Sequence, residues 1–508
     1  MVAILTAGGL AAGAVTPALA APGAPPAPVA PTAPAPGPIA WGPCSTPGLV
    51  AAKAQCGFLS VPLDHAKPAG KKIQLAVSRV KHTVPDAQYQ GVALANPGGP
   101  GGSGLGLSRL GSKVPKNAGA AYDWIGFDPR GVGSSKPALS CQADYGGYHR
   151  PDYRPEHGAE AAWLPKTRAY AKACGKKGGE LLKHLRTEDT VKDMDLIRQA
   201  LGAEQITYYG FSYGTYLGQV YATMFPDKVR RMVLDGVIDT RDWWYEANLN
   251  QNVAFERNIK TFFGWVAKND EHYHLGTTAD AVEKRYEETS EKLRKKPAGG
   301  LIGASELTDI FLRAGYNVTE YTDVADAFVA ATKNDAVTLK AAFDSAGSPT
   351  DDNNYAVYLA TQCTDAPFPH DWATWKRDNV RTDKKAPFNT WGNAWYNAPC
   401  LAWPAKPGPK PVVSGKLKNG PLLISETDDG ATPYAGALQA RRTFPGSSLI
   451  EGVDGHTHSS SLSGVKCVDD KVADYLLTGA LPKRTAGEGH SDVQCPALAP
   501  PDPGAPAK

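Results

Sequence analysis

Short apolar runs alternate with turn residues and amphipathic stretches along the chain from Gly91. The runs occupy residues 92–95, 124–127, 206–209 and 231–236. Strands that alternate with helices are typical of a parallel sheet with helices on both faces. The pattern therefore predicts an α/β fold with a mostly parallel central sheet flanked by helices.

One of the intervening helices is expected to begin near Thr187. Threonine is a common N-cap, and Glu188 and Asp189 follow it at the positive end of the helix dipole. The apolar residues of this stretch recur at helical spacing and share one face: Val191, Met194, Ile197 and Leu201. We expect that face to pack on the sheet.

The character of the sequence changes after Asp239. Aromatic and helical sequence continues past Trp403, a strand pattern returns at residues 421–425, and a closing helix is expected at 472–477. The economical interpretation is one α/β domain interrupted by a mainly helical cap or lid insertion. The predicted organisation is a core at 41–239 and 411–480, the insertion at 240–410 and a loop-like tail at 481–508.

The N-terminal segment is apolar and closes on small residues. Residues 1–21 are rich in Ala, Gly and Leu and end near Ala18-Leu19-Ala20, which is typical of a signal-peptidase site. Gly, Thr and Pro residues interrupt the stretch and argue against a membrane anchor. The following Pro/Ala alternation cannot pack a core. We therefore expect a signal peptide at 1–21, a leader at 22–40 and a secreted, extracellular protein.

Composition and charge narrow the class of partner. Of 508 residues, 42% are hydrophobic and 21% are charged, which is enough material for a large core plus an insertion. The 54 basic and 51 acidic residues leave a formal charge of +3 without a clustered basic stripe. We therefore expect neither nucleic acid nor an anionic surface as a partner, and a monomer.

The eight cysteines are even in number, and none lies in a C-x-x-C pair. In an exported chain this pattern favours disulfides over metal sites. The sequence alone allows many pairings, of which we favour the sequential one: Cys44 with Cys56, Cys141 with Cys174, Cys363 with Cys400 and Cys467 with Cys495.

The pentapeptide Gly210-Phe211-Ser212-Tyr213-Gly214 lies between a predicted strand and a helix-like stretch. A serine hydroxyl becomes a useful nucleophile when a sharp strand-to-helix turn lifts it toward a base, and such a turn requires very small flanking residues. Gly210 and Gly214 supply them. The pattern predicts a nucleophile elbow with Ser212 at its tip.

A serine nucleophile also needs an orienting acid and a base, which follow it in this chain order in enzymes built on such an elbow. Asp429 follows the predicted strand at 421–425 and is the preferred acid, with Asp428 and Glu426 as alternatives.

The base is expected from His456 or His458. These residues are two apart and can face the same way on an extended segment, so spacing does not choose between them. A metal pair would need a third ligand, and none of suitable type is near, so no metal is predicted.

The oxyanion of an acyl-transfer intermediate needs two backbone N–H donors. Tyr213, directly after the serine, offers one. The glycine-rich segment 96–104 offers the other, with Gly99 or Gly98 as the donor. The segment lacks the Gly-Lys-Ser/Thr of a phosphate-binding loop.

Taken together, these motifs resemble those of the prolyl-iminopeptidase-like α/β-hydrolases, and more closely those of the secreted tripeptidyl aminopeptidases of actinomycetes. The likeness spans about residues 44–482. The motifs are residues 56–64, 96–104, 128–135, 210–214, 363–365, 429–433 and the segment with His456 and His458.

The resemblance implies an α/β-hydrolase fold and a serine exopeptidase that needs no cofactor. It implies Ser212 as nucleophile, Asp429 as orienting acid and a histidine as general base. In similar proteins the base precedes a Ser/Leu, Gly and Cys frame, which residues 461–467 match after His458. His458 is therefore preferred, and His456 is the alternative because a glycine precedes it as in many relatives.

Aminopeptidases of this kind hold the substrate ammonium with carboxylates, for which Glu246, Glu256 and Asp365 are the candidates. Trp243, Trp244 and Tyr245 are either lining residues of a peptide pocket or part of the core of the insertion. The preferred function is release of short peptides, with tripeptides expected, from free N-termini of peptides or proteins. The alternatives are a prolyl iminopeptidase or carboxylesterase of the same fold, and a non-catalytic cell-surface binding protein.

Overall fold

The computed structural model describes residues 36–242, 244–347 and 352–504. The predicted signal peptide, most of the predicted leader and Trp243 lie outside the described residues. The expectations for them stay predictions.

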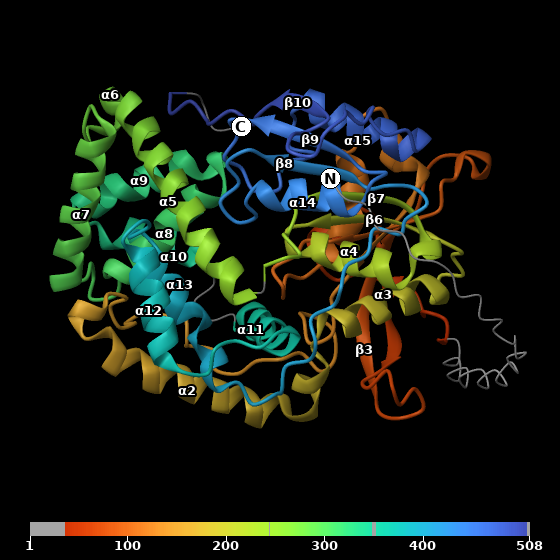
Figure 1. The fold of residues 1–508 in the computed structure, drawn as a ribbon, viewed down its shortest axis with the longest axis horizontal. Coiled ribbons are helices and arrows are strands. Elements are labelled where there is room, and N and C mark those ends of the chain that lie inside the picture. Colours follow the sequence, from red (N-terminus) through yellow and green to blue (C-terminus); the bar gives the residue numbers. More distant parts are fainter. Residues whose placement is uncertain (1–35, 243, 348–351, 505–508) are drawn as a thin grey trace, which may run out of the picture. The chain divides into compact units, whose positions relative to one another are not determined.

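One mixed sheet of ten strands runs through the described residues (Figure 1). The strands are β1 Gly42–Pro43, β2 Gln55–Pro62, β3 Lys72–Val80, β4 Val92–Asn96, β5 Asp123–Phe127, β6 Ile206–Phe211, β7 Val229–Asp235, β8 Leu422–Glu426, β9 Ser448–Val453 and β10 Val493–Pro496. Their order is β1-β2-β3-β5-β4-β6-β7-β8-β9-β10. From β5 to β10 all neighbours are parallel, whereas β1, β2 and β3 pair antiparallel. The predicted mostly parallel sheet is confirmed.

Alternate residues of the strands pack on opposite faces of the sheet. In β4, Val92 and Leu94 join a core with α3 and α4, whereas Ala93 and Ala95 face a core that includes α15. This period-two burial is what fixes the register of a sheet that is covered on both sides. The helices of this part are α1 Pro47–Ala51, α2 Ala159–Gly178, α3 Thr187–Ala200, α4 Tyr213–Met224, α14 Ala435–Thr443 and α15 Lys466–Thr478.

Between β7 and β8 the described residues contain helices and no strand. They are α5 Trp244–Lys268, α6 Asp270–Tyr273, α7 Ala279–Lys295, α8 Ala304–Tyr316, α9 Tyr321–Thr332, α10 Ala336–Ala346, α11 Asn353–Asp365, α12 Trp372–Asp383 and α13 Thr390–Asn397. Figure 1 shows most of them gathered on one side of the sheet. Helices α5 and α7 to α10 share an apolar core of their own, with Phe262, Phe311 and Phe328 in it.

Three details differ from the sequence-based expectations. Helix α3 begins at Thr187, but Arg186 is its N-cap residue and no side chain caps it. The Thr187 hydroxyl bonds to Asp365 and Tyr213 instead, so a tertiary contact replaces the local cap. The expected loop-like tail contains β10, which pairs parallel with β9. The antiparallel pair of β2 and β3 had no counterpart in the predicted pattern.

The structure joins the eight cysteines as Cys44–Cys56, Cys141–Cys174, Cys363–Cys400 and Cys467–Cys495. No helix among the described residues has the length and apolar character needed to cross a bilayer.

Candidate active site

Ser212 lies on the sharp turn between β6 and α4. Its backbone has φ of 53° and ψ of −126°, a left-handed conformation that is rare for a residue with a side chain. A Cβ at Gly214 would lie 2.7 Å from the carbonyl oxygen of Asn96, so the turn closes only with glycine there. The strained turn places Ser212 at the first turn of α4, where the helix dipole favours negative charge.

The Asp429 carboxylate and the His458 imidazole form a buried pair. Nδ1 of His458 lies 2.8 Å from Oδ2 and 3.0 Å from Oδ1 of Asp429. The backbone N–H groups of Ala431 and Thr432 donate to Oδ1, and the Thr432 hydroxyl donates to Oδ2. Since Nδ1 faces the carboxylate, Nε2 is the ring atom left to accept a proton.

Electrostatics favour a charged imidazole at this position. Burial alone lowers the pKa of His458, but the charge and hydrogen bond of Asp429, with a smaller effect of Asp235, outweigh it and raise the pKa above its usual value. An imidazole with a raised pKa is a stronger base.

The elbow and the histidine loop meet at one backbone oxygen. The Ser212 N–H donates to the carbonyl oxygen of Asp235 over 2.9 Å, and the hydroxyl of Ser459 donates to the same oxygen over 3.2 Å. Because Ser459 directly follows His458, the candidate nucleophile and the candidate base are neighbours in space although 246 positions separate them.

The alternative base, His456, and the alternative acids, Asp428 and Glu426, have different surroundings. Nδ1 of His456 lies 3.9 Å from Asp428, outside hydrogen-bond range, and burial lowers its pKa. Asp428 lies 3.1 Å from Nε of Arg257. Glu426 accepts hydrogen bonds from the backbone N–H groups of Thr457 and Leu498. These contacts favour Asp429 and His458 over the alternatives.

The glycine-rich segment 96–104 packs against the elbow. A Cβ at Gly98 would lie 2.8 Å from the Tyr213 nitrogen and 2.9 Å from the Ser212 Cβ. The Gly98 N–H donates to Oδ1 of Asn96, so that donor is already used. Gly99 is therefore the remaining candidate for the second oxyanion donor, and it lines the same cavity as Ser212.

Residues 128–135, which follow β5, support the glycine-rich segment. Oδ1 of Asp128 accepts hydrogen bonds from the Ser103 hydroxyl and the Gly104 N–H, and Oδ2 accepts one from the Ser134 N–H. Asp128 therefore fixes the end of the glycine segment to the sheet.

A cavity of about 1180 Å³ extends from Ser212 into the helical insertion. Gly99 and Thr432 line it on the sheet side. Several insertion helices and the segment around α2 supply the rest, including Asn248, Asp309, Tyr316, Tyr355, Tyr358 and Tyr396. Sequence reasoning missed the share of the segment around α2, because only tertiary packing, such as the Trp163–Trp395 stack, brings it to the insertion.

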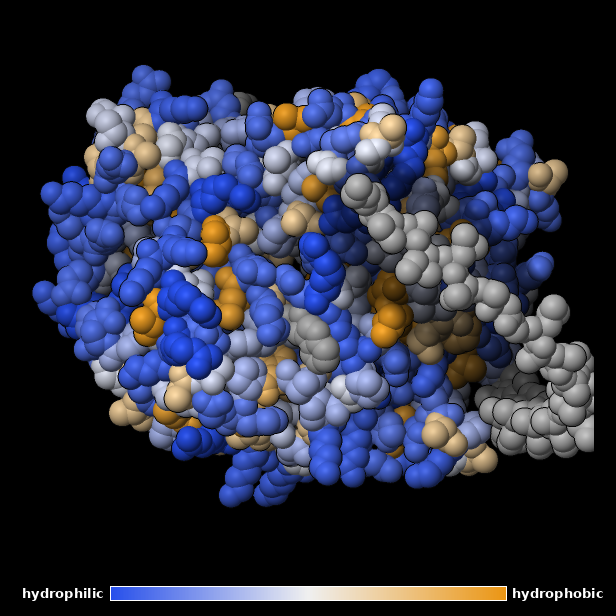
Figure 2. Space-filling view, viewed as in Figure 1, coloured by the Kyte–Doolittle hydropathy of each residue, from blue (hydrophilic) through white to orange (hydrophobic). Residues whose placement is uncertain are grey.

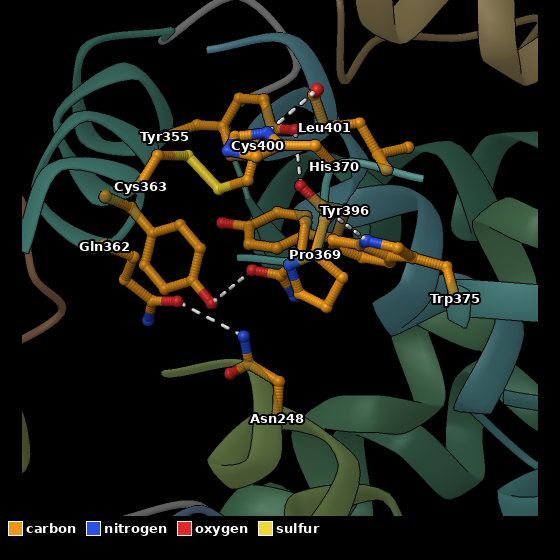
Figure 3. The surroundings of a disulfide bond; sticks show 12 residues. Asn248, Tyr355, Gln362, Cys363, Pro369, His370, Trp375, Tyr396, Cys400 and Leu401 are labelled. Carbon is orange, nitrogen blue, oxygen red and sulfur yellow. Dashed lines mark hydrogen bonds between the residues drawn. A yellow bond between two sulfur atoms is a disulfide. The ribbon is translucent and has the colours of Figure 1, made fainter. Parts of the chain in front are cut away.

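Figure 3 shows how one wall of the cavity is held. The Cys363–Cys400 disulfide ties α11 to the turn that follows α13. Tyr355 on α11 donates to the Tyr396 carbonyl over 2.7 Å, and Asn248 on α5 donates to Gln362 over 3.2 Å. Three helices are thus joined at this wall.

The three carboxylates expected to bind the substrate ammonium do not line the cavity in the part of the chain that the structure describes. Glu246 is exposed elsewhere on α5. Glu256 accepts from the Phe388 N–H and pairs with Lys260. Asp365 accepts from the N–H and hydroxyl of Thr187. Trp244 lines the cavity, whereas Tyr245 packs on Trp375 in the core.

A different charged group reaches the cavity wall. Arg150 pairs with Asp309 over 2.6 Å and with Glu306 over 3.2 Å. One guanidinium faces two carboxylates, so the group carries one net negative charge. The Asp309 side chain keeps 30% of its surface exposed, whereas that of Glu306 keeps only 3%. No local pattern in the sequence indicates this group, since Arg150 precedes Glu306 by 156 positions.

Comparison with known proteins agrees with the geometry. The model of the alpha/beta hydrolase fold family matches residues 94–457. The chain therefore belongs to the α/β-hydrolase fold family.

Within that family, the chain is 43% identical to the tripeptidyl aminopeptidase of Streptomyces coelicolor, over 92% of this chain and 87% of that protein. It is 32% identical to the serine protease Hip1 of Mycobacterium tuberculosis, over 88% and 90% of the two chains. It is 33% identical to carboxylesterase B of the same species, over 84% and 85%. The first two similarities place the chain among the serine peptidases of this fold.

Proposed function

We propose that this protein is a secreted serine aminopeptidase that releases short peptides, chiefly tripeptides, from free N-termini through an acyl-enzyme. The observation that supports the proposal is that the elbow of Ser212 and the loop of the paired His458 bond to the same backbone oxygen, and that Ser212 lines a large cavity. Similarity to the tripeptidyl aminopeptidase of Streptomyces coelicolor supports the choice of substrate.

The proposed chemistry uses Ser212 as nucleophile. As its oxygen attacks the peptide carbonyl carbon, its proton moves to Nε2 of His458, and Asp429 stabilises the imidazolium. Collapse of the intermediate breaks the C–N bond, and His458 gives the proton to the leaving amine. Water then attacks the ester, again through His458, and the peptide acid leaves.

The developing oxyanion would lie between two backbone donors. The Tyr213 N–H is at the first turn of α4, where an N–H has no partner within the helix. The Gly99 N–H is the second donor, because Gly98 already bonds to Asn96. Fixed donors in a water-poor site stabilise such charge without reorganisation.

The net negative group of Arg150, Glu306 and Asp309 is the proposed binding site for the substrate ammonium. Asp309 lines the cavity and keeps free surface, so its carboxylate can accept the additional ion pair. The cavity exceeds the range of about 300–1,000 Å³ typical of sites for drug-sized ligands, which gives room for several residues between the ammonium and Ser212.

Secretion is proposed from the apolar leader and the disulfides. A monomer is proposed because, on the face shown in Figure 2, hydrophobic residues form only small separated spots among hydrophilic ones. Gel filtration with light scattering would test this proposal, and a stable dimer would contradict it.

The central experiment is mass spectrometry of the products from a defined mixture of free and N-acetylated peptides. We expect tripeptides from the free N-termini only. Ser212→Ala should fold and lose nearly all turnover. Release of single N-terminal prolines would favour a prolyl iminopeptidase. Turnover of short esters without peptide cleavage would favour a carboxylesterase, the name of one relative.

The assignment of Asp309 to the ammonium site can be tested against a matched control variant. Asp309→Asn should raise KM for a tripeptide anilide by about tenfold or more, since it removes a charge that is worth more than one hydrogen bond. Asp239 also lines the cavity, but Arg241 neutralises it. Asp239→Asn should leave KM unchanged. Equal effects of the two variants would reject the assignment of Asp309.

A further inference from the structure

Asp235, the last residue of β7, contacts both halves of the candidate active site. Its backbone oxygen accepts the Ser212 N–H of the elbow and the Ser459 hydroxyl of the histidine loop. Its side-chain Oδ2 accepts the Ser461 N–H over 2.8 Å and the Ser461 hydroxyl over 2.5 Å. The Ser461 hydroxyl is also 2.6 Å from the Tyr209 hydroxyl of β6.

We propose that Asp235 is a positioning residue for the base: it fixes the loop that carries His458 to the nucleophile elbow, and its negative charge supports the imidazolium formed during turnover. This inference rests on the proposed function, in which His458 takes the proton of Ser212. None of the sequence motifs assigns a role to Asp235.

The surroundings of the other carboxylate oxygen support a role for the charge. Asp235 is 1% exposed, and its Oδ1 is buried with no hydrogen-bond partner among the described residues. A carboxylate oxygen buried in this way is costly unless a cation compensates it. Protonation of His458 supplies that cation.

The imidazole lies directly against the end of β7. A Cβ at Gly236, the residue after Asp235, would be 2.9 Å from Cε1 and 3.1 Å from Nδ1 of His458. Only a residue without a side chain allows the ring to lie there. Asp235 is thus one position from the contact between the strand and the ring.

Other titratable groups also surround this ring. Asp429, in the loop after β8, bonds to it directly. The ring of Tyr316 on α8 meets it at 5.9 Å between centroids. Burial, with smaller effects of the Asp235 and Asp469 charges, raises the pKa of Tyr209 on β6. Burial, with a smaller effect of Asp235, also raises the pKa of Glu426 at the end of β8. Burial raises the pKa of Asp235 to about 6, so the carboxylate is ionised at neutral pH, where the base works.

Glu426 provides the matched control. Glu426 is buried and has a raised pKa. It accepts the backbone N–H of Thr457, which directly precedes His458, and so anchors the same loop. No hydrogen bond or ion pair joins it to the imidazole ring among the described residues. Glu426→Gln therefore tests the effect of weakening the loop without removing the charge next to the ring.

The experiment compares Asp235→Asn, Glu426→Gln and the wild type by the pH dependence of kcat/KM and of Ser212 labelling by a fluorophosphonate. Asparagine keeps an oxygen that can accept from Ser461 but removes the charge. We expect the acid limb of Asp235→Asn to move to lower pH by about half a unit or more, with kcat reduced and KM little changed. The acid limb of Glu426→Gln should stay at the wild-type position.

Identical acid limbs in Asp235→Asn and the wild type would overturn the inference. If Asp235→Asn does not fold, NMR of labelled histidine in the wild-type protein replaces it. The His458 signals should then show a second inflection near pH 6 from Asp235, and a single-step titration would overturn the inference. Failure of the proposed function is distinguishable, because the wild-type enzyme would then show neither peptide cleavage nor labelling of Ser212.

Discussion

Asp429→Asn is the most direct perturbation of the candidate active site. In the wild type, the Asp429 carboxylate lies 2.8 and 3.0 Å from Nδ1 of His458, with Asp429 fully buried. Charges about 4 Å apart attract by about 4 kcal/mol at the effective dielectric constant of about 20 that suits protein sites. Since each 1.36 kcal/mol is tenfold in rate, removal of this attraction should lower kcat/KM by about a thousandfold.

The assay is hydrolysis of a tripeptide anilide, with folding checked by circular dichroism. The control is Asp428→Asn, because Asp428 is the neighbouring acid but faces Arg257 at a partly exposed position. Exposed ion pairs contribute about 1 kcal/mol or less, so this variant should lose less than about fivefold. Loss of activity in Asp428→Asn with less than tenfold loss in Asp429→Asn would refute the assignment of the acid.

Two further predictions concern stability. Burial raises the pKa of Glu426 to about 7 from 4.5, so its folded form binds a proton more tightly than its unfolded form. Its stabilising contribution is present below its unfolded pKa and is lost as pH rises through about 7. Glu426→Gln should therefore show a smaller fall in the free energy of unfolding between about pH 5 and about pH 8 than the wild type, measured in urea; an equal fall would contradict this sign. Removal of the Cys363–Cys400 disulfide by a double Ser substitution should cost about 4 kcal/mol for its 37-residue separation and raise KM, because it loosens α11 at the cavity. Removal of Cys44–Cys56 should cost about 3 kcal/mol and leave KM unchanged, measured by urea unfolding and anilide kinetics. An unchanged KM after removal of Cys363–Cys400 would show that the cavity wall does not need this disulfide.

The sequence predicts five of the parallel strands, β4 to β8, because each of them is a short apolar run between turn residues. Strands β4 to β8 lie where the runs predicted them. Strand β10 was missed because Val493–Pro496 is too short to show alternation and forms only by pairing with β9. Local pattern therefore predicts central strands better than edge strands.

The residues of the candidate site also divide into those placed by local sequence and those placed by tertiary packing. Ser212 directly follows β6 and Asp429 lies three positions after the end of β8, so their placement depends on local chain geometry that the sequence carries. The proposed ammonium site depends on tertiary packing instead, because Arg150 and Asp309 approach only when α8 packs against the segment before α2. Asp365 was a candidate binding residue because it is an acid in a recognisable motif; in the structure it bonds to Thr187, whose hydroxyl also bonds to the Tyr213 hydroxyl.

The backbone N–H of His458 donates to the carbonyl oxygen of Tyr316 at the end of α8, over 2.8 Å. A rigid outward swing of α8 would break that bond and leave the imidazole without one of its supports. Opening of the cavity by a movement of α8 would therefore disturb the candidate base. We therefore expect substitutions that loosen the end of α8 to lower kcat more than they raise KM.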